Sequence, residues 1–378
     1  MGAEVLLYGY GIVCLSMLVF NVIYSLHLRA DDRRTQKRVE VIQRQAEGRL
    51  EKLRADVHQP LQASHLAWMR RRLARISYLL AFDRFLDEQD TEEPAFREYL
   101  RQLQPVFLYL STVYWKREDT QAAYYCHFLA RHRLQRHMEL DQVQRVVLSY
   151  LKKDSLYCRL NALKALCSFG SPEVLGDALE ELSRDGGSQL HEKMVTEALL
   201  SYTGSAKALI ELLWRRFERF SAQIQRAVLD YIRFQSGDYK PQMEEILRDG
   251  GRDKELRLAA IRYFGRYPDE GVRGVLLGFV RSGDALQWEY AAIAATALAR
   301  YPGQDVVDAL MGAMHSSNWY VRYNASASLE AHGLSYEGMM DILAGDDRYA
   351  REMLNYRLES RRLQRSAAAP REKEAVGV

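Results

Sequence analysis

The sequence predicts an all-α protein in which one membrane-spanning helix precedes a stack of helical pairs, an α-solenoid. Two observations lead to this prediction. Near the amino terminus, the run from Val5 to Leu28 has no formally charged side chain. Farther along the chain, one helical pattern returns at a nearly constant interval. Few folds keep such a period, so we expect an elongated array whose core grows along its length.

The first expected element is the apolar run, which occupies residues 1–28 with its flank. As an α-helix rising about 1.5 Å per residue, it would span roughly 36 Å, which is enough to cross a bilayer. Tyr8, Tyr10 and Tyr24 lie toward its ends, where such rings favour the membrane interface. A cleaved signal peptide is the alternative, but the first four residues supply no basic side chain and no small-x-small cleavage site follows. We therefore expect an uncleaved anchor.

A basic cluster directly follows the apolar run and sets the expected orientation. Its members are Arg29, Arg33, Arg34, Lys37 and Arg38. Two aspartates lie among them, whereas the other side of the run carries only Glu4 and the amino terminus. Because basic residues favour the cytoplasmic side, we expect a single-pass protein of the cell membrane with its amino terminus outside and its solenoid in the cytoplasm. The cluster could also touch anionic headgroups.

Residues 29–62 are expected to form a juxtamembrane helix. Apolar side chains recur there at three- and four-residue intervals, which is typical of an amphipathic helix or a short coiled coil. They are Val39, Ile42, Ala46, Leu50, Leu53 and Val57. Three roles stay open for this segment: a stalk, a helix for self-association through residues 39–57, or a strut packed on the body. Residues 63–139 follow as an irregular helical opening of the solenoid.

From about residue 140 the pattern becomes periodic. Equivalent positions, separated by 34, 33, 31, 33 and 32 residues, are occupied by Arg159, Lys193, Arg226, Arg257, Tyr290 and Arg322. Small residues follow them and let neighbouring helices approach closely, and a second helix is expected between copies. Each pair can bury only one face against its neighbours, so repeats are expected over residues 140–345 and a capping helix over 346–365. We expect disorder over 366–378.

These units resemble the HEAT-repeat family, including the short HEAT-like units of bacterial proteins. The match consists of a turn acid, an early arginine and an alanine: Asp154 with Arg159 and Ala162, Asp253 with Arg257 and Ala260, and more loosely Asn318 with Arg322 and Ala325. The resemblance implies a right-handed-type α-solenoid of HEAT-like helical pairs over about residues 140–345. It departs at Thr196 and Leu229, where alanine is expected, and at Tyr290, where arginine is expected. Any ladder of stacked arginines is therefore interrupted.

Composition and motifs exclude several classes of chemistry. The chain has 53 basic and 50 acidic side chains, so its net charge of +3 is too small to imply nucleic acid. It contains no zinc-protease, serine-hydrolase or nucleotide-binding motif. His127, His132 and His137 are spaced by five, about 140° around a helix, so they share no face and we expect solvated histidines. We expect no enzyme activity, metal or cofactor.

The four cysteines form no metal-binding or disulfide pattern, and we expect buried free thiols in a reducing compartment. Tyrosines and tryptophans recur in or beside the arginine-bearing helices, which the resemblance suggests line the concave side. These residue types suit binding hot spots, although the same pattern is typical of inter-repeat core. The candidate partner-binding residues are Trp288, Tyr290, Trp319, Tyr320, Tyr323, Tyr231 and Tyr263. Those near the C-terminal end, Trp319, Tyr320 and Tyr323, are favoured.

The expected function is a membrane-anchored scaffold or adaptor whose solenoid binds another protein, which could itself be a membrane protein. An accessory subunit of an envelope-assembly complex, such as a glycosyltransferase, would fit this description. The repeats are also similar to those of phycobilin lyases, so a lyase-like enzyme or a cofactor-handling protein is an alternative, and a nucleic-acid binder is another. A polar, convergent pocket would favour an enzyme, whereas an open aromatic groove would favour a scaffold.

Overall fold

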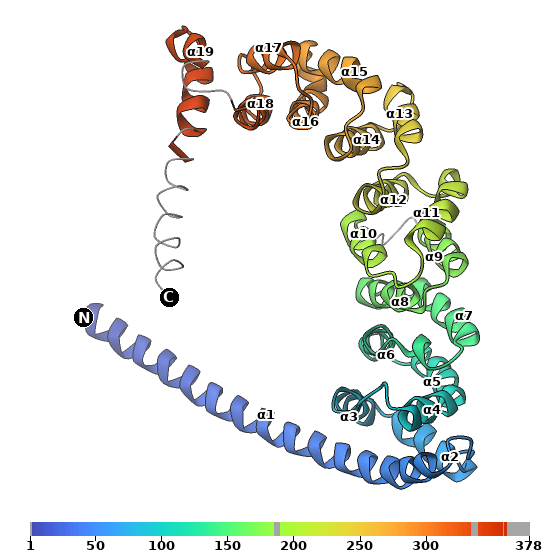
Figure 1. Ribbon diagram of the computed structural model, residues 1–378. Helices are drawn as coiled ribbons and strands as arrows, with labels where there is room; N and C mark the ends of the chain where they lie inside the picture. Colours follow the sequence, from blue (N-terminus) through green and yellow to red (C-terminus); the bar gives the residue numbers. More distant parts are fainter. Residues whose placement is uncertain (1, 185–189, 334–338, 358, 361–378) are drawn as a thin grey trace, which may run out of the picture. The chain divides into compact units, whose positions relative to one another are not determined.

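The structure is a computed structural model that describes residues 2–184, 190–333, 339–357 and 359–360 (Figure 1). Within these residues all regular secondary structure is helical, as the sequence predicts. The chain divides into two compact units, Met1–Leu212 and Leu213–Val378. The end of the predicted capping helix, from residue 361, and the whole predicted tail at 366–378 lie outside the described residues.

One continuous helix, α1 (Gly2–Ala55), joins the predicted anchor to the predicted juxtamembrane segment. Among the described residues it is the one helix long and apolar enough to cross a membrane, judged by length and composition, and its apolar window is fully exposed. In its C-terminal half, the apolar side chains from Val39 to Leu53 that recur at helical spacing are buried. They pack in unit 1 where α1 contacts α3 (Ile76–Asp87) and α4 (Pro94–Gln102).

Of the three roles left open for this segment, the structure therefore shows the strut. The prediction of self-association through residues 39–57 is corrected, because the apolar face that it needs is already occupied within the chain. Two polar contacts hold α1 farther toward its amino end. Arg84 of α3 pairs with Asp32 at 2.7 Å. The guanidinium of Arg38 lies 5.9 Å from the centre of the Tyr78 ring.

Two layers of helices build the rest of unit 1 (Figure 1). One layer contains α3, α6 (Asp119–His132), α8 (Leu156–Phe169) and α10 (Glu192–Leu200). The other contains α2 (Ala63–Leu73), α5 (Gln104–Trp115), α7 (Asp141–Ser149) and α9 (Pro172–Arg184). Successive members of each layer contact one another, so the stacking starts at α2 and α3. α11 (Ala206–Arg215) follows these layers in the chain. Cys126, Cys158 and Cys167 are buried free thiols of unit 1, as predicted, whereas Cys14 is exposed on α1.

Unit 2 repeats the two-layer arrangement. One layer contains α12 (Ala222–Gln235), α14 (Lys254–Arg266), α16 (Trp288–Leu298) and α18 (Trp319–Ala331). The other contains α13 (Lys240–Arg248), α15 (Glu270–Arg281) and α17 (Gln304–Ala313). A short helix, α19 (Met340–Ala344), precedes a last helix over residues 348–357. Small side chains such as Ala292 and Ala295 are buried on α16, which lets α14 and α18 pack closely on either side of it.

The recurring arginines lie near the start of the helices of one layer, where their side chains donate hydrogen bonds to backbone carbonyls of the preceding segment. Arg257 in α14 donates from Nε to the carbonyl of Leu247 (3.1 Å). Arg322 in α18 donates from Nη1 to the carbonyl of Ser316 (2.5 Å). Arg159 in α8 makes the same kind of bond to a preceding carbonyl. These arginines satisfy carbonyls that the end of the preceding segment leaves without a helical partner.

Each of these arginines follows, by four residues, a side chain that caps its helix. The capping residues are Ser155, Asp253 and Asn318, whose side-chain oxygens accept from backbone N–H groups of the first turn. In α8 the cap is therefore Ser155, and the predicted turn acid, Asp154, precedes it. A further copy lies at Asp347, which accepts from two first-turn N–H groups, and Arg351, which donates to Gly345 (2.8 Å). The last helix thus starts like a repeat helix, and the spacing of Asp347 and Arg351 was the sequence signal for it.

Candidate partner-binding surface

The structure divides the seven predicted partner-binding residues between core and surface. Tyr231, Tyr263 and Tyr290 are buried, so their prediction as contacts for a partner is corrected. Tyr263 accepts a hydrogen bond on its hydroxyl from the backbone N–H of Tyr239 (3.0 Å), at the start of α13, the preceding helix, which belongs to the other layer. A buried tyrosine needs such a partner for its hydroxyl group.

Tyr290 fills the place where the repeat expects an arginine. Its ring stacks on Phe279 of α15 with ring centres 5.0 Å apart. The guanidinium of Arg257, from the preceding repeat, lies 4.9 Å from the centre of the Tyr290 ring. A cation–π contact between neighbouring repeats therefore stands where two stacked arginines were expected, which keeps this tyrosine in the core.

The other four candidates meet in unit 2 and form one surface, the aromatic cluster, made of Trp288, Trp319, Tyr320 and Tyr323. Trp288 stacks on Tyr320 with centres 5.4 Å apart, and Trp319 stacks on Tyr323 at 4.8 Å. The two pairs meet edge to face between Trp319 and Tyr320 at 5.2 Å. Trp319 is 49% exposed and Tyr320 is 56% exposed, while Trp288 and Tyr323 are half-buried.

The packing of α16 against α18 explains why these rings come together. Trp288 and Trp319 are the first residues of the two helices. Asn324 and Ser328 of α18 donate side-chain hydrogen bonds to carbonyl groups of α16, at 2.9 and 2.7 Å. These bonds fix the alignment of the two helices, so their first turns lie together. Asn318 caps α18 through the N–H of Tyr320 (2.9 Å), which holds that first turn in place.

A cavity of about 610 Å³ lies beside the aromatic cluster, lined by residues from the end of α15 to the start of α18, including Trp288 and Val321. Its charged lining groups are bound to neighbours. Arg281 donates to the carbonyl of Asp305 (3.0 Å), and His315 contacts the carboxylate of Asp347 (2.8 Å). That contact holds the pKa of Asp347 below its usual range. Trp288 thus joins this cavity to the aromatic cluster, while Arg281 and His315 in its lining are engaged in structural contacts.

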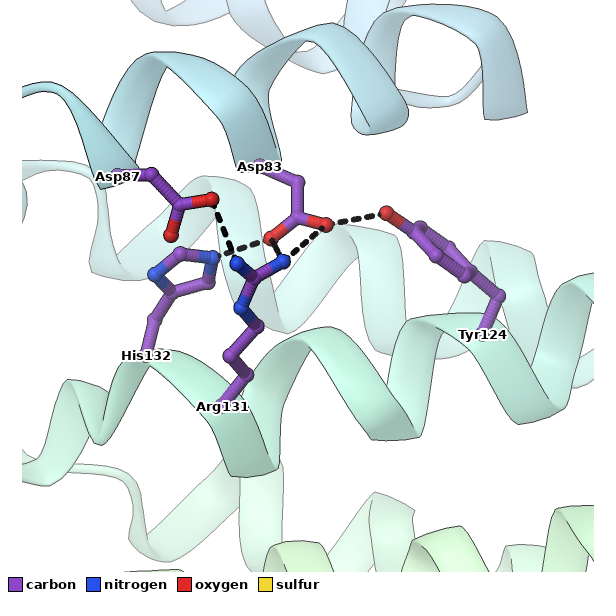
Figure 2. Close-up of polar contacts among 5 residues, drawn as sticks. All are labelled: Asp83, Asp87, Tyr124, Arg131 and His132. Atoms are coloured by element: carbon purple, nitrogen blue, oxygen red, sulfur yellow. Dashed lines mark hydrogen bonds and ion pairs between the residues drawn. The ribbon is translucent and has the colours of Figure 1, made fainter.

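A second group of polar side chains lies in unit 1, where α3 meets α6 (Figure 2). Asp83 is buried, and its carboxylate contacts His132 Nε2 and the Tyr124 hydroxyl, both at 2.5 Å. Arg131 reaches Asp83 at 3.2 Å and Asp87 at 2.6 Å. Burial alone would raise the pKa of Asp83, but hydrogen bonds from His132 and Tyr124 outweigh it and hold this pKa below its usual value.

Three side chains of this polar group could in principle serve as metal ligands. Asp83, Asp87 and His132 each offer one ligand atom, and these atoms lie within 4.8 Å of one another. Carboxylate and imidazole ligands suit a divalent transition metal. Arg131, however, bonds to both carboxylates, so a metal ion would have to displace its guanidinium (Figure 2). The arrangement fits a structural ion-pair network that ties α3 to α6 better than it fits a metal site.

The three histidines of this region differ from one another in burial. His127 is exposed, as predicted. The prediction of solvated histidines is wrong for His132, whose side chain bonds to Asp83, and for His137, which is buried. No sequence signal linked His132 to Asp83, because the two residues lie 49 positions apart and meet only when α6 packs on α3.

The basic cluster after the apolar run lies on the exposed part of α1. Arg29, Arg33, Arg34 and Lys37 are exposed, and Arg38 is half-buried beside Tyr78. The cluster thus extends from the end of the apolar window to the point where α1 packs against α3.

The family model of HEAT repeats matches residues 241–330, which run from α13 into α18. All four members of the aromatic cluster lie inside the matched range. A search of curated proteins found no match to the chain.

Proposed function

We propose that this chain is an adaptor that is anchored in the cell membrane and holds a protein partner at the bilayer. The proposal starts from the HEAT repeats of residues 241–330. HEAT repeats build helical scaffolds for protein interaction. The observation that carries the proposal is the aromatic cluster, because it places large exposed rings on the repeats themselves.

Exposed tryptophan and tyrosine rings supply much of the free energy of binding in protein interfaces. In the aromatic cluster each ring already packs on another ring, with ring centres 4.8 to 5.4 Å apart. Little side-chain freedom is then lost when a partner binds, which favours affinity. The buried tyrosines Tyr231, Tyr263 and Tyr290 differ from the cluster, because burial removes them from contact with a partner.

The membrane part of the proposal rests on α1. Its exposed apolar window has no partner surface among the described residues, and basic residues follow it directly. The proposed orientation has the amino terminus outside and the repeats in the cytoplasm. Since α1 is one helix from Leu28 to the buried Val39, unit 1 would sit roughly 16 Å along the helix from the end of the apolar run. α1 would thus act as a rigid spacer.

The finer proposal is a non-catalytic accessory subunit of a membrane complex, such as an envelope-assembly complex that contains a glycosyltransferase. A second membrane protein is the natural partner, because the spacer keeps unit 1 close to the bilayer. A non-catalytic role is supported by the cavity beside the aromatic cluster, whose arginine and histidine are bound to neighbouring groups. The net charge of +3 supports a protein partner rather than nucleic acid.

Affinity capture of the full-length chain from gently solubilised membranes tests this proposal. The wild type should retain a partner in a stoichiometric amount, and the double variant Trp288→Ala, Tyr320→Ala should lose it while its melting temperature changes little. The matched control is Tyr157→Ala, since Tyr157 is an exposed tyrosine in the first turn of α8 in unit 1. Partner loss from this control as well would mean that the aromatic cluster is not the specific contact.

Two results would overturn the proposal. One is the absence of any stoichiometric partner together with turnover of a small molecule by the purified chain. The other concerns orientation. A reporter fused after Val378 should be active in the cytoplasm, and a reporter active only outside the cytoplasm would contradict the assigned topology.

A further inference from the structure

A second concavity, here called the C-terminal groove, opens beside the aromatic cluster in unit 2. It has a volume of about 360 Å³. α18 supplies Trp319 and Arg322, and the last helix supplies the rest of the lining: Tyr349, Glu352, Met353 and Tyr356. The groove therefore lies between the last two helices that carry the capped arginine pattern.

An incompletely satisfied guanidinium forms part of this groove. Arg322 is only 7% exposed. Its Nη1 donates to the carbonyl of Ser316, while its buried Nε has no hydrogen-bond partner among the described residues. The guanidinium lies 5.3 Å from the centre of the Tyr349 ring. A buried donor without a partner costs free energy, and an acceptor brought by a ligand would remove that cost.

The charges around the groove are out of balance. The carboxylate of Glu352, which lines the groove, already pairs with Arg348 at 2.7 Å. Arg351 and Arg357 donate to backbone carbonyls instead, and within the part of the chain that the structure describes neither of them, nor Arg322, forms an ion pair with a carboxylate. By contrast, an arginine elsewhere in unit 2, Arg252, pairs with a glutamate at 2.7 Å. Among the described lining residues, Arg322 thus carries a positive charge that has no ion-pair partner.

Aromatic rings flank this charge. Trp319 is half exposed, Tyr349 is 65% exposed and Tyr356 is 58% exposed. Met353, which also lines the groove, is buried. A surface that combines open aromatic rings with a guanidinium suits an apolar or aromatic side chain next to a carboxylate, since rings pack on rings and Arg binds carboxylate through two parallel hydrogen bonds.

We propose that the C-terminal groove binds a linear segment of a partner protein in which a carboxylate side chain stands beside an aromatic one. The carboxylate meets Arg322, and the aromatic ring packs among Trp319, Tyr349 and Tyr356. This proposal rests on the proposed adaptor function and names the chemistry of its partner. A groove of 360 Å³ is at the small end of ligand pockets and takes a few side chains rather than a folded surface.

The observations favour a peptide over a nucleic acid. Single-stranded nucleic acid needs a positive track along several phosphates together with stacking rings. The lining of the C-terminal groove offers one guanidinium, that of Arg322, and a carboxylate, that of Glu352. A run of phosphates would be repelled by this carboxylate at each charge, whereas a single acidic side chain meets that repulsion once and gains the bond to Arg322.

Fluorescence anisotropy of the full-length chain in mild detergent tests the proposal. The probe is a fluorescein-labelled peptide, Gly-Pro-Glu-Phe-Glu-Phe-Pro-Gly, and the comparison peptide has glutamine in place of both glutamates. The acidic peptide should bind at least about tenfold more tightly than the glutamine peptide, as expected for charge-assisted hydrogen bonds to Arg322. Equal affinities for the two peptides would overturn the proposal.

Three variants and a control localise the binding. Arg322→Gln and Tyr356→Ala should each weaken binding of the acidic peptide by about tenfold. Since Arg322→Gln also removes a structural bond, Glu352→Gln provides an independent test: it removes the one carboxylate among the described lining residues and should tighten binding severalfold. The control is Arg300→Gln, an exposed arginine outside the groove, which should bind as the wild type does. No gain from Glu352→Gln would contradict the charge argument.

Other occupants give distinct outcomes. Tighter binding of a ten-nucleotide oligothymidylate than of the acidic peptide would overturn the peptide proposal in favour of nucleic acid. A chain ended after Ser360 that binds the peptide more than tenfold more tightly would identify the chain's own last residues as the occupant. If the capture experiment retains a partner through the aromatic cluster but the peptide does not bind, the groove proposal fails and the adaptor stands. If the peptide behaves as expected but no partner is captured, the adaptor function fails.

Discussion

His65, a buried histidine in α2, should make the stability of unit 1 sensitive to pH between 7 and 5. Its Nε2 lies 3.1 Å from the hydroxyl of Tyr99, and its ring stacks near Trp68 with centres 6.4 Å apart. Its Nδ1 is buried without a hydrogen-bond partner among the described residues. Burial lowers the pKa of His65 to about 4, and the positive charge of Arg49 acts in the same direction.

The unfolded chain binds a proton on His65 more readily than the folded chain does, and this decides how the free energy of unfolding changes with pH. Above pH 6.5 the imidazole is neutral in both folded and unfolded chains, so its contribution to stability is complete. As the pH falls from 6.5 toward 4, the unfolded chain takes up a proton that the folded chain resists, and the free energy of unfolding decreases. A pKa of 6.5 unfolded and about 4 folded gives a loss of about 2 kcal/mol between pH 7 and pH 5, and solvent screening lowers it to roughly 1–2 kcal/mol.

Urea unfolding of the full-length chain in detergent, followed by far-UV circular dichroism at both pH values, measures this loss. The variant His65→Gln keeps a group that can hydrogen-bond to Tyr99 but does not titrate. Its loss between pH 7 and pH 5 should be smaller than that of the wild type by about 1–2 kcal/mol. His137→Gln serves as a comparison, because burial lowers the pKa of His137 as well. An equal loss in wild type and His65→Gln would refute the reasoning.

Three further substitutions test the packing, each by urea unfolding. Tyr301→Phe should lower the free energy of unfolding by about 1–3 kcal/mol, because the buried hydroxyl bonds two backbone groups of the preceding repeat, at 3.1 and 3.4 Å, whereas Tyr320→Phe should have little effect. Ile42→Ala should lower the free energy of unfolding by about 2–5 kcal/mol, because Ile42 is buried where α1 packs as a strut. A loss below about 1 kcal/mol would mean that this half of α1 does not pack on unit 1. Asp83→Asn should lower the free energy of unfolding by about 3–5 kcal/mol, since it leaves Arg131 and His132 without their buried acceptor charge. The matched control, Asp87→Asn, changes an exposed carboxylate and should lower it by less than about 1 kcal/mol. Equal losses would contradict the network in Figure 2.

The repeat was predictable from the sequence because its signals are local. A capping side chain, an arginine four residues later and small residues after it recur in each copy, as at Asp253 and Arg257. Asp347 and Arg351 have the same spacing, although the predicted array of repeats ends at residue 345. The helix that follows Asp347 forms the second wall of the C-terminal groove, which the predicted repeat boundaries therefore do not include.

The candidate site could be predicted only in part. Trp319 and Tyr320 were favoured because they lack counterparts in the other repeats, and the structure exposes both. Tyr231 and Tyr263 lie in the equivalent helices of other repeats and are also aromatic candidates for partner binding by sequence, yet they are buried. A tyrosine at the start of a helix and one near its middle face different neighbours, and no pattern within the helix tells whether the adjacent repeat covers the ring.

The sequence by itself determined the apolar run, the basic residues after it, the repeat period and the helix starts, because each depends on side chains within a few turns of one another. The tertiary structure decided the rest. It turned the amphipathic segment of α1 into a strut, paired His132 with Asp83, and divided the tyrosines into core and surface. These outcomes depend on contacts between residues 24 to 49 positions apart in the sequence. Whether a side chain is buried therefore depends on which distant helix packs against it, and the pattern within its own helix does not contain that information.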